Sequence, residues 1–214
     1  MNGFDQYIKP SKKKFEADPF GYSSLGRIRW GVLAEMAGFE HIDIEKPATA
    51  EELKNPVLWL TQAEALSKAA SIVITSNPEF ENFPENMRGI CDGQFKATGL
   101  MIVGYSLEIC LKAMLIMIKG IDIYISEEKK HRHHKLHKLA DFVPNLSEKD
   151  MAILELLTHY VYWAGRYPDP AYGFEQKTEQ IFDLAEKHQV TVKEVFQLAA
   201  KVMGHARIVA NELL

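Results

Sequence analysis

Two ionisable side chains in the middle of an apolar segment, Glu108 and Lys112, are the first candidates for chemistry. They are four residues apart with the acid first, so on a helix they share a face and can form an ion pair. Tyr105 and Lys119 extend the same strip. Such a pair either stabilises a core helix or lines a polar cleft, because buried charges are costly unless they are paired. The residues alone leave both interpretations open.

The second candidate is a basic, histidine-rich segment, Glu127–Lys138, which reads EEKKHRHHKLHK. His133 and His137 are four residues apart and would share a helical face, as two metal ligands require. No acidic or cysteine ligand completes the set at a recognisable spacing, so we predict no metal site. The other interpretations are a solvated basic segment and a segment that contacts RNA phosphates by charge. For RNA contact we select Arg132, His134 and His137.

Aromatic side chains gather around the proline-rich turn RYPDPAYG. Their rings could stack on unpaired bases or on an adenine. They could equally form the core and a dimer interface, where aromatic residues are common. The five aromatic residues are Tyr160, Tyr162, Trp163, Tyr167 and Tyr172. We take Tyr167 from this group, together with Tyr105, as candidates for binding RNA or a nucleotide.

The composition limits the classes of partner. A net charge of −4 over 214 residues creates no global attraction to nucleic acid, so RNA contact would need a local basic patch. The two cysteines, Cys91 and Cys110, form neither a disulfide framework nor a CxxC zinc motif. The N-terminus lacks the apolar core of a signal peptide, and Glu108 and Lys112 interrupt the longest apolar stretch, 100–118. We therefore expect a cytoplasmic protein without a membrane segment.

Helical periodicity dominates residues 56–214, and strand patterns are nearly absent, so we predict an all-α fold. The simplest arrangement is a bundle of four or five antiparallel helices. A loop with Pro84, Gly89 and Gly93 is expected between the first two helices. The predicted helices run from Pro56 to just before Asn77, from Gln94 to Lys119, from His134 to Phe142, from Ser147 to about Gly165, from Phe174 to Lys187, and from Thr191 to Leu213.

Residues 1–55 are predicted to form an N-terminal extension to this bundle. A short helix is expected from Leu25 to Ala37, with Ser23 or Ser24 as its cap. The segment from Glu40 to Pro47 is predicted to be extended. The chain is therefore expected to consist of an appendage and one helical domain.

Three segments in this order resemble the HEPN family. The first is VLWLTQAEALSKAASIVI, and the second is GYSLEICLKAML, in which a glutamate precedes a lysine by four residues. The third is HKLHKLADF followed by YVYWAGRYP. With the last helix, the resemblance covers residues 57–214.

The resemblance implies a small helical bundle that forms a homodimer. Many HEPN proteins are metal-independent ribonucleases of toxin–antitoxin or antiphage systems, and others are non-catalytic partners that bind RNA or nucleotides. The implied ligand is therefore RNA or a nucleotide, and an antitoxin-type protein is an implied partner. No cofactor is expected.

In catalytic family members, an arginine in the position of Arg166 is followed after four to six residues by a histidine. The arginine would stabilise charge on the phosphate, and the histidine would transfer protons to or from the ribose hydroxyl or the leaving oxygen. In this chain the corresponding positions hold Ala171, Tyr172 and Gly173. The family motif is therefore absent after Arg166.

Two other histidines could substitute for the missing one. Arg132 and His137 have the required spacing, with four residues between them, but they lie in a segment so rich in basic residues that chance would produce the match. His159 lies before the end of the helix that precedes Arg166 and could approach the guanidinium from there.

We therefore expect a HEPN-like protein that acts on or binds RNA. Its catalytic residues would be Arg166, Glu108, Lys112 and His159. The alternative is a non-catalytic dimeric module that binds nucleotides or proteins, which the missing histidine favours. A metal protein built on the histidine cluster is a third interpretation.

Overall fold

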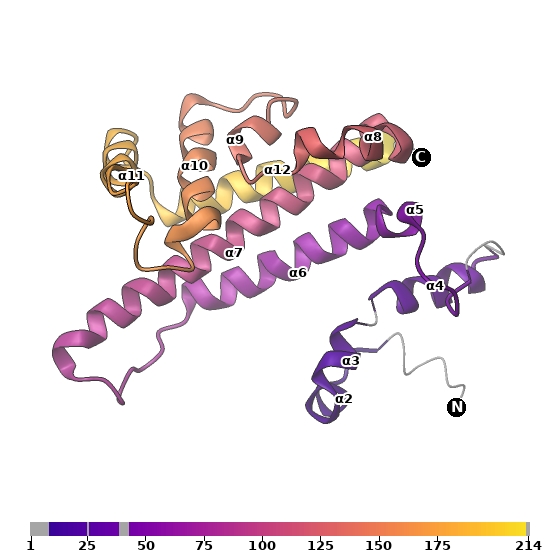
Figure 1. Cartoon of the computed structure of the whole chain (residues 1–214), viewed down its shortest axis with the longest axis horizontal. Coiled ribbons are helices and arrows are strands. Elements are labelled where there is room, and N and C mark those ends of the chain that lie inside the picture. Colours follow the sequence, from indigo (N-terminus) through magenta and orange to yellow (C-terminus); the bar gives the residue numbers. More distant parts are fainter. Residues whose placement is uncertain (1–8, 25, 39–42, 213–214) are drawn as a thin grey trace. The chain divides into compact units, whose positions relative to one another are not determined.

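Figure 1 shows the computed structural model of the chain, which describes residues 9–24, 26–38 and 43–212. Every regular element in these ranges is a helix, so the protein belongs to the all-α class, as predicted. The chain forms two compact units, Met1–Leu58 and Trp59–Leu214.

The N-terminal unit contains more helix than the sequence patterns predict. Its helices are α2 (Lys12–Ala17), α3 (Pro19–Ser24), α4 (Gly26–Met36) and α5 (Ala50–Leu53). The expected helix over residues 25–37 corresponds to α4, and the other three were not predicted. Ser23 and Ser24 lie inside α3 and do not cap the next helix, so that prediction is wrong. Ser11 caps α2, and Thr49 forms a capping box with Glu52 at the start of α5.

Arg27 connects α4 to the segment that follows it. Its guanidinium donates to a Glu52 carboxylate oxygen at 2.7 Å and to the backbone carbonyls of Asp43 and Lys46. Residues 44–46 form a turn and a bend rather than the predicted extended segment, and residues 40–42 lie outside the described part of the chain. The arginine explains the turn, because its several donors draw neighbouring carbonyls toward one point.

The core of the second unit is built on the long helix α7 (Glu85–Lys119). Helix α6 (Pro56–Thr75) runs beside α7 in the opposite direction, and α12 (Val192–Glu212) runs along α7 in the same direction (Figure 1). Helix α10 (Glu148–His159) crosses α7 on the side opposite to α6. Such a central position is typical of a helix that is apolar nearly all round. The α7 side chains in the core include Val103, Leu107, Cys110, Leu111 and Met114.

Helix α7 begins nine residues earlier than predicted, so the expected loop around Gly89 and Gly93 is helical. Glycine lowers helix propensity, but propensity is a weak guide where tertiary contacts oppose it. Here the ring of Phe95 packs edge-on against Phe80 at 6.3 Å. The Lys96 ammonium donates to the backbone carbonyls of Ile74 and Ser76, which fastens this part of α7 to the end of α6.

After α7 the chain again departs from the expected pattern. Gly120, with φ at 81°, ends α7 as predicted, but α8 (Ile121–His131) follows at once. Helix α9 (Leu136–Leu139) is shorter than the expected helix over residues 134–142. The histidine-rich segment is therefore divided between the end of α8, a connecting stretch and α9.

The remaining helices agree closely with the predicted ones. A capping box of Ser147 and Asp150 starts α10, which continues into the π-helical turn η1 (Tyr160–Ala164). Helix α11 (Gln176–Lys187) follows the proline-rich turn. A capping box of Thr191 and Glu194 precedes α12, and Leu213, the predicted last residue of this helix, lies outside the described residues.

Two glycines allow the elements around the candidate site to approach closely. A Cβ atom on Gly104 would lie 2.5 Å from Cγ2 of Val161, and one on Gly165 would lie 2.3 Å from Cβ of Met101. Any larger residue at either position would push η1 away from α7. These contacts hold Tyr105 on α7 and Tyr162 on η1 next to the same region of the unit.

Two segments, Ala50–Thr75 and Glu85–Lys119, are long and apolar enough to cross a membrane. This is weak evidence, because the core helix of a soluble protein meets the same criteria, and most of the apolar window of α7 is buried in the protein. The cytoplasmic location stays a prediction.

Candidate functional site

The carboxylate of Glu108 lies in the core, and this residue is only 5% exposed. One of its oxygens, Oε1, accepts a hydrogen bond from Nζ of Lys112 at 2.7 Å, so the predicted ion pair is present. The other oxygen, Oε2, lies 2.7 Å from Nδ1 of His134. Burial of a carboxylate requires such partners, and here both oxygens are satisfied.

His134 is held at one end and reaches solvent at the other, with 39% of its side chain exposed. Because an ionised carboxylate can only accept, Nδ1 carries the proton in this contact. The opposite nitrogen, Nε2, makes no hydrogen bond within the described residues, and in this tautomer it is the basic atom of the ring. A carboxylate that fixes the tautomer and orientation of an imidazole is a recurrent arrangement in general acid–base catalysis.

Two tyrosine rings flank this imidazole. The centroid of Tyr105 lies 6.1 Å from that of His134, and the centroid of Tyr162 lies 5.3 Å from it, both with nearly perpendicular planes. Together, Tyr105, Glu108, Lys112, His134 and Tyr162 are called the Glu108–His134 site below. Tyr162 comes from a π-helical turn, an element that is frequent at functional sites.

A second contact fixes the chain just after His134. The backbone N–H of Leu136 donates to the hydroxyl of Thr158 at 3.0 Å, and that hydroxyl donates to the carbonyl of Leu154 at 2.8 Å. Leu136 and Thr158 are both buried. The histidine is thus positioned by α10 as well as by the carboxylate on α7.

A separate polar cluster lies at the end of α7. Nζ of Lys119 lies 2.6 Å from Oε2 of Glu127 and 3.1 Å from Nε2 of His131. The ring of His131 stacks on Tyr124 with centroids 5.6 Å apart. Lys119 and Lys130 both donate to Glu127 and lower the pKa of its carboxyl to about 2. We call these residues the Lys119–His131 cluster. The sequence analysis did not predict it, although Glu127 and His131 are four residues apart and can therefore share a helical face.

His133 and His137 do not lie on one helix, as the metal interpretation requires. His133 precedes α9 whereas His137 lies in it, so the expected shared helical face is absent. Within the described residues, no three His, Cys, Asp or Glu side chains come together as metal ligands would. The pKa of His133 is lowered, first by burial and then by Lys112 and Lys135.

No hydrogen bond within the described residues joins Arg166 to a histidine. Its side chain is exposed, donates to the backbone carbonyl of Tyr162, and lies 5.5 Å from the ring centroid of Tyr167. No hydrogen bond or ion pair in the described part of the chain joins Arg166 to Glu108, Lys112 or His159.

The other predicted contact residues are also dispersed. Arg132 is the C-cap residue of α8 and is exposed, and no hydrogen bond within the described residues joins it to His137. Nδ1 of His137 is buried and has no hydrogen-bond partner among the residues that the structure describes. His159 is partly buried, and burial lowers its pKa, with Lys177 and His137 contributing to the decrease. Of the predicted site residues, therefore, Tyr105, Glu108, Lys112 and His134 come together.

Comparison with known proteins gives no match: no family model, no curated protein and no solved structure matches the chain. The resemblance to the HEPN family therefore depends on the three sequence segments quoted above.

Proposed function

We propose that the protein acts on RNA as a HEPN-like, metal-independent endoribonuclease, with His134 as the residue that moves protons. The observation that carries this proposal is the 2.7 Å contact between Nδ1 of His134 and the buried carboxylate of Glu108. It places the proton on Nδ1 and leaves Nε2 as a base on the exposed side of the ring. RNA as the substrate comes from the family resemblance.

In the proposed reaction, Nε2 of neutral His134 takes the proton of a ribose 2′-hydroxyl. The 2′-oxygen attacks phosphorus, the bond from phosphorus to the 5′-oxygen breaks, and the proton passes to that leaving oxygen. The products are a 2′,3′-cyclic phosphate and a 5′-hydroxyl end. Glu108 stabilises the imidazolium while it carries the proton, as a buried carboxylate does in other histidine dyads. A nearby cation such as Lys112 would stabilise the negative charge of the transition state.

The setting of this activity is part of the same proposal. A homodimer, a toxin–antitoxin or antiphage role and an antitoxin-type partner are all supported by the resemblance over residues 57–214. Arg166 would then bind a phosphate rather than work beside a histidine of its own turn.

The test is cleavage of end-labelled RNA by purified wild type, His134→Ala and Glu108→Gln, each with and without EDTA. We expect wild-type cleavage in EDTA, cyclic-phosphate ends, and a rate about 10²- to 10⁴-fold lower in His134→Ala. His188→Ala is the matched control, because this side chain has no hydrogen bond, ion pair or ring contact within the described residues. Absence of cleavage by wild type on several RNAs, or unchanged cleavage by His134→Ala, would contradict the proposal.

A non-catalytic module that binds nucleotides or proteins is the alternative, and the environment of Arg166 favours it. This side chain is occupied by the carbonyl of Tyr162 and the ring of Tyr167, and no histidine follows it at the family spacing. In this alternative the Glu108–His134 contact serves stability alone. RNA or nucleotide binding without cleavage, unchanged by His134→Ala, is the result that would support it.

A further inference from the structure

A concave pocket of about 450 Å³ lies next to the Glu108–His134 site. It is formed by the end of η1, the proline-rich turn and the start of α11. Four aromatic rings line it: Tyr162, Trp163, Tyr167 and Phe174. Tyr167 is 58% exposed and Phe174 is 51% exposed, so large apolar faces remain open to solvent. We call this hollow the aromatic pocket.

The turn that forms one wall of the aromatic pocket is held by its own hydrogen bonds. Oδ1 of Asp169 accepts from the backbone N–H of Ala171 at 2.8 Å, and the carbonyl of Ala171 accepts from the N–H of Phe174 at 3.1 Å. The N–H of Gly173 donates to the Glu175 carboxylate at 3.1 Å. These bonds shape the wall without any ligand, so the pocket does not need to form on binding.

Two cations accompany the rings. Nζ of Lys177 lies 4.1 Å from the ring centroid of Phe174, and the guanidinium of Arg166 lies 5.5 Å from that of Tyr167. The one carboxylate of the lining, Asp169, accepts from a backbone N–H of the turn. Rings that offer their faces beside positive charges match the chemistry of a nucleotide, in which a flat base is joined to a phosphate.

We infer that the aromatic pocket binds one unpaired nucleobase of single-stranded RNA, next to the phosphodiester that is cleaved. This inference rests on the proposed function. Tyr162 connects the two places, because its ring lines the pocket and lies 5.3 Å from the ring of His134. A base stacked in the pocket would carry its own ribose and phosphate to the exposed side of His134. A paired base cannot enter, since its faces are covered by neighbouring base pairs.

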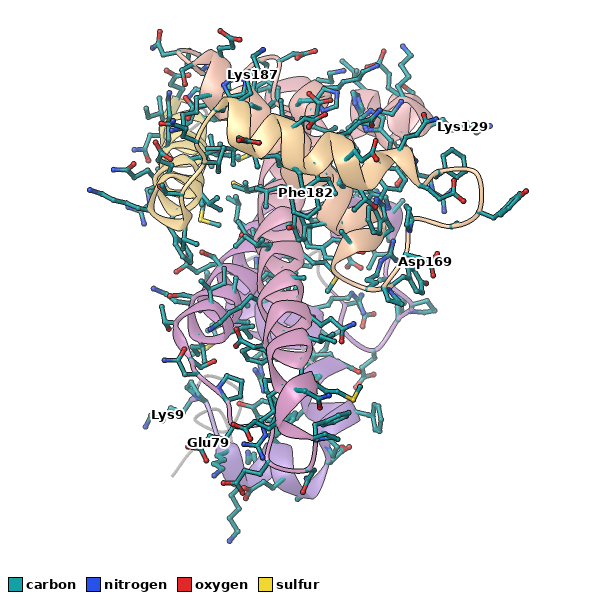
Figure 2. All side chains as sticks on the ribbon, turned by 90° about the vertical axis from the view of Figure 1, so that its left-hand side faces the viewer. Lys9, Glu79, Lys129, Asp169, Phe182 and Lys187 are labelled. Atoms are coloured by element: carbon teal, nitrogen blue, oxygen red, sulfur yellow. The ribbon has the colours of Figure 1, made fainter. Side chains whose placement is uncertain are left out.

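The test uses a short fluorescent RNA with 2′-O-methyl ribose, because blocking the 2′-oxygen separates binding from cleavage. Phe174→Leu keeps an apolar side chain but removes the aromatic face, and we expect an affinity about 10-fold lower than that of wild type. Phe182→Leu is the matched control, since Phe182 is 68% exposed but lies on α11 outside the pocket. In Figure 2 Phe182 lies on α11, whereas Asp169 lies on the turn before it.

A second set of RNAs carries one abasic position each, placed in turn along the strand. We expect one of these positions to weaken wild-type binding about as much as Phe174→Leu does. Combining that position with Phe174→Leu should give no further loss, because both changes remove the same contact. Equal affinities of wild type and Phe174→Leu, or additive losses at every abasic position, would overturn the inference while the cleavage proposal stands. If wild type binds none of these RNAs and also cleaves none of the unmodified RNAs, the proposed function fails together with the inference.

Discussion

The Glu108–His134 site and the Lys119–His131 cluster each bring together a glutamate, a lysine and a histidine, but the contacts among these residues differ. In the first, the histidine contacts the carboxylate at 2.7 Å, and the lysine takes the other oxygen. In the second, Nε2 of the histidine faces the lysine at 3.1 Å, and the carboxylate is 3.9 Å away.

The difference decides which imidazole can act as a base. An ammonium group can only donate, so Nε2 of His131 accepts from Lys119 and its lone pair is already used. The ring is also covered on one face by Tyr124. His134 instead uses its proton to meet Glu108 and keeps its basic nitrogen toward solvent. Residue types alone therefore do not identify a catalytic histidine; the atom that each partner occupies does.

The largest expected difference between the two places is in RNA cleavage. We expect His131→Ala to retain activity within about threefold of wild type, whereas His134→Ala loses about 10²- to 10⁴-fold. The measurement is the single-turnover cleavage rate at saturating enzyme, which excludes differences in binding. Equal losses in both variants would show that the comparison of the two histidines is wrong.

The next effect is on stability, because the two carboxylates differ in burial. Glu108→Ala leaves the ammonium of Lys112 and the ring of His134 without their buried partner, and we expect it to lower the free energy of unfolding by about 3 kcal/mol. Glu127→Ala should destabilise less, since the Glu127 side chain is 27% exposed and solvent weakens its ion pairs. Urea unfolding followed by circular dichroism measures both. A loss in Glu127→Ala that equals the loss in Glu108→Ala would contradict this ranking.

Most of the fold follows from local patterns, and its departures from the prediction come from contacts between elements. Helical periodicity and capping residues predict α10 and α12 because these signals lie within one element. The predicted start of α7 was wrong. Gly89 and Gly93 are typical of loops, but the contacts of Phe95 and Lys96 with the preceding segment favour a helix. The π-helical turn needs close packing of η1 on α7, which no short sequence window contains.

The contacts of the candidate site also divide into one that the sequence predicts and one that it does not. The pairing of Glu108 with Lys112 is a spacing of four residues on one helix, so it could be predicted. The contact of Glu108 with His134 joins residues 26 apart in sequence, and four histidines in one short segment could have supplied it. The choice depends on where α8 ends and on the bond between Leu136 and Thr158. That information exists only in the folded unit.

The smallest expected effect is a dependence of stability on pH. The pKa of His131 is lowered, chiefly by burial and then by Lys119, although Glu127 opposes the change and Lys112 and Lys130 add to it. In the unfolded chain this histidine takes up a proton near its ordinary pKa of about 6.5. The unfolded state therefore binds more protons as the pH falls below that value, and the free energy of unfolding decreases.

For one histidine the slope is at most about 1.4 kcal/mol per pH unit, and His133 contributes in the same direction. Urea unfolding between about pH 5 and pH 7.5 measures it while carboxyl groups stay ionised. His131→Gln should flatten the dependence, since it removes the titrating group, and His188→Gln should leave it as in wild type. An unchanged slope in His131→Gln would mean that the folded protein does not lower the pKa of His131 below that of a solvated histidine. The contrast between an imidazole turned toward a lysine and one turned toward a carboxylate would then lose its energetic basis.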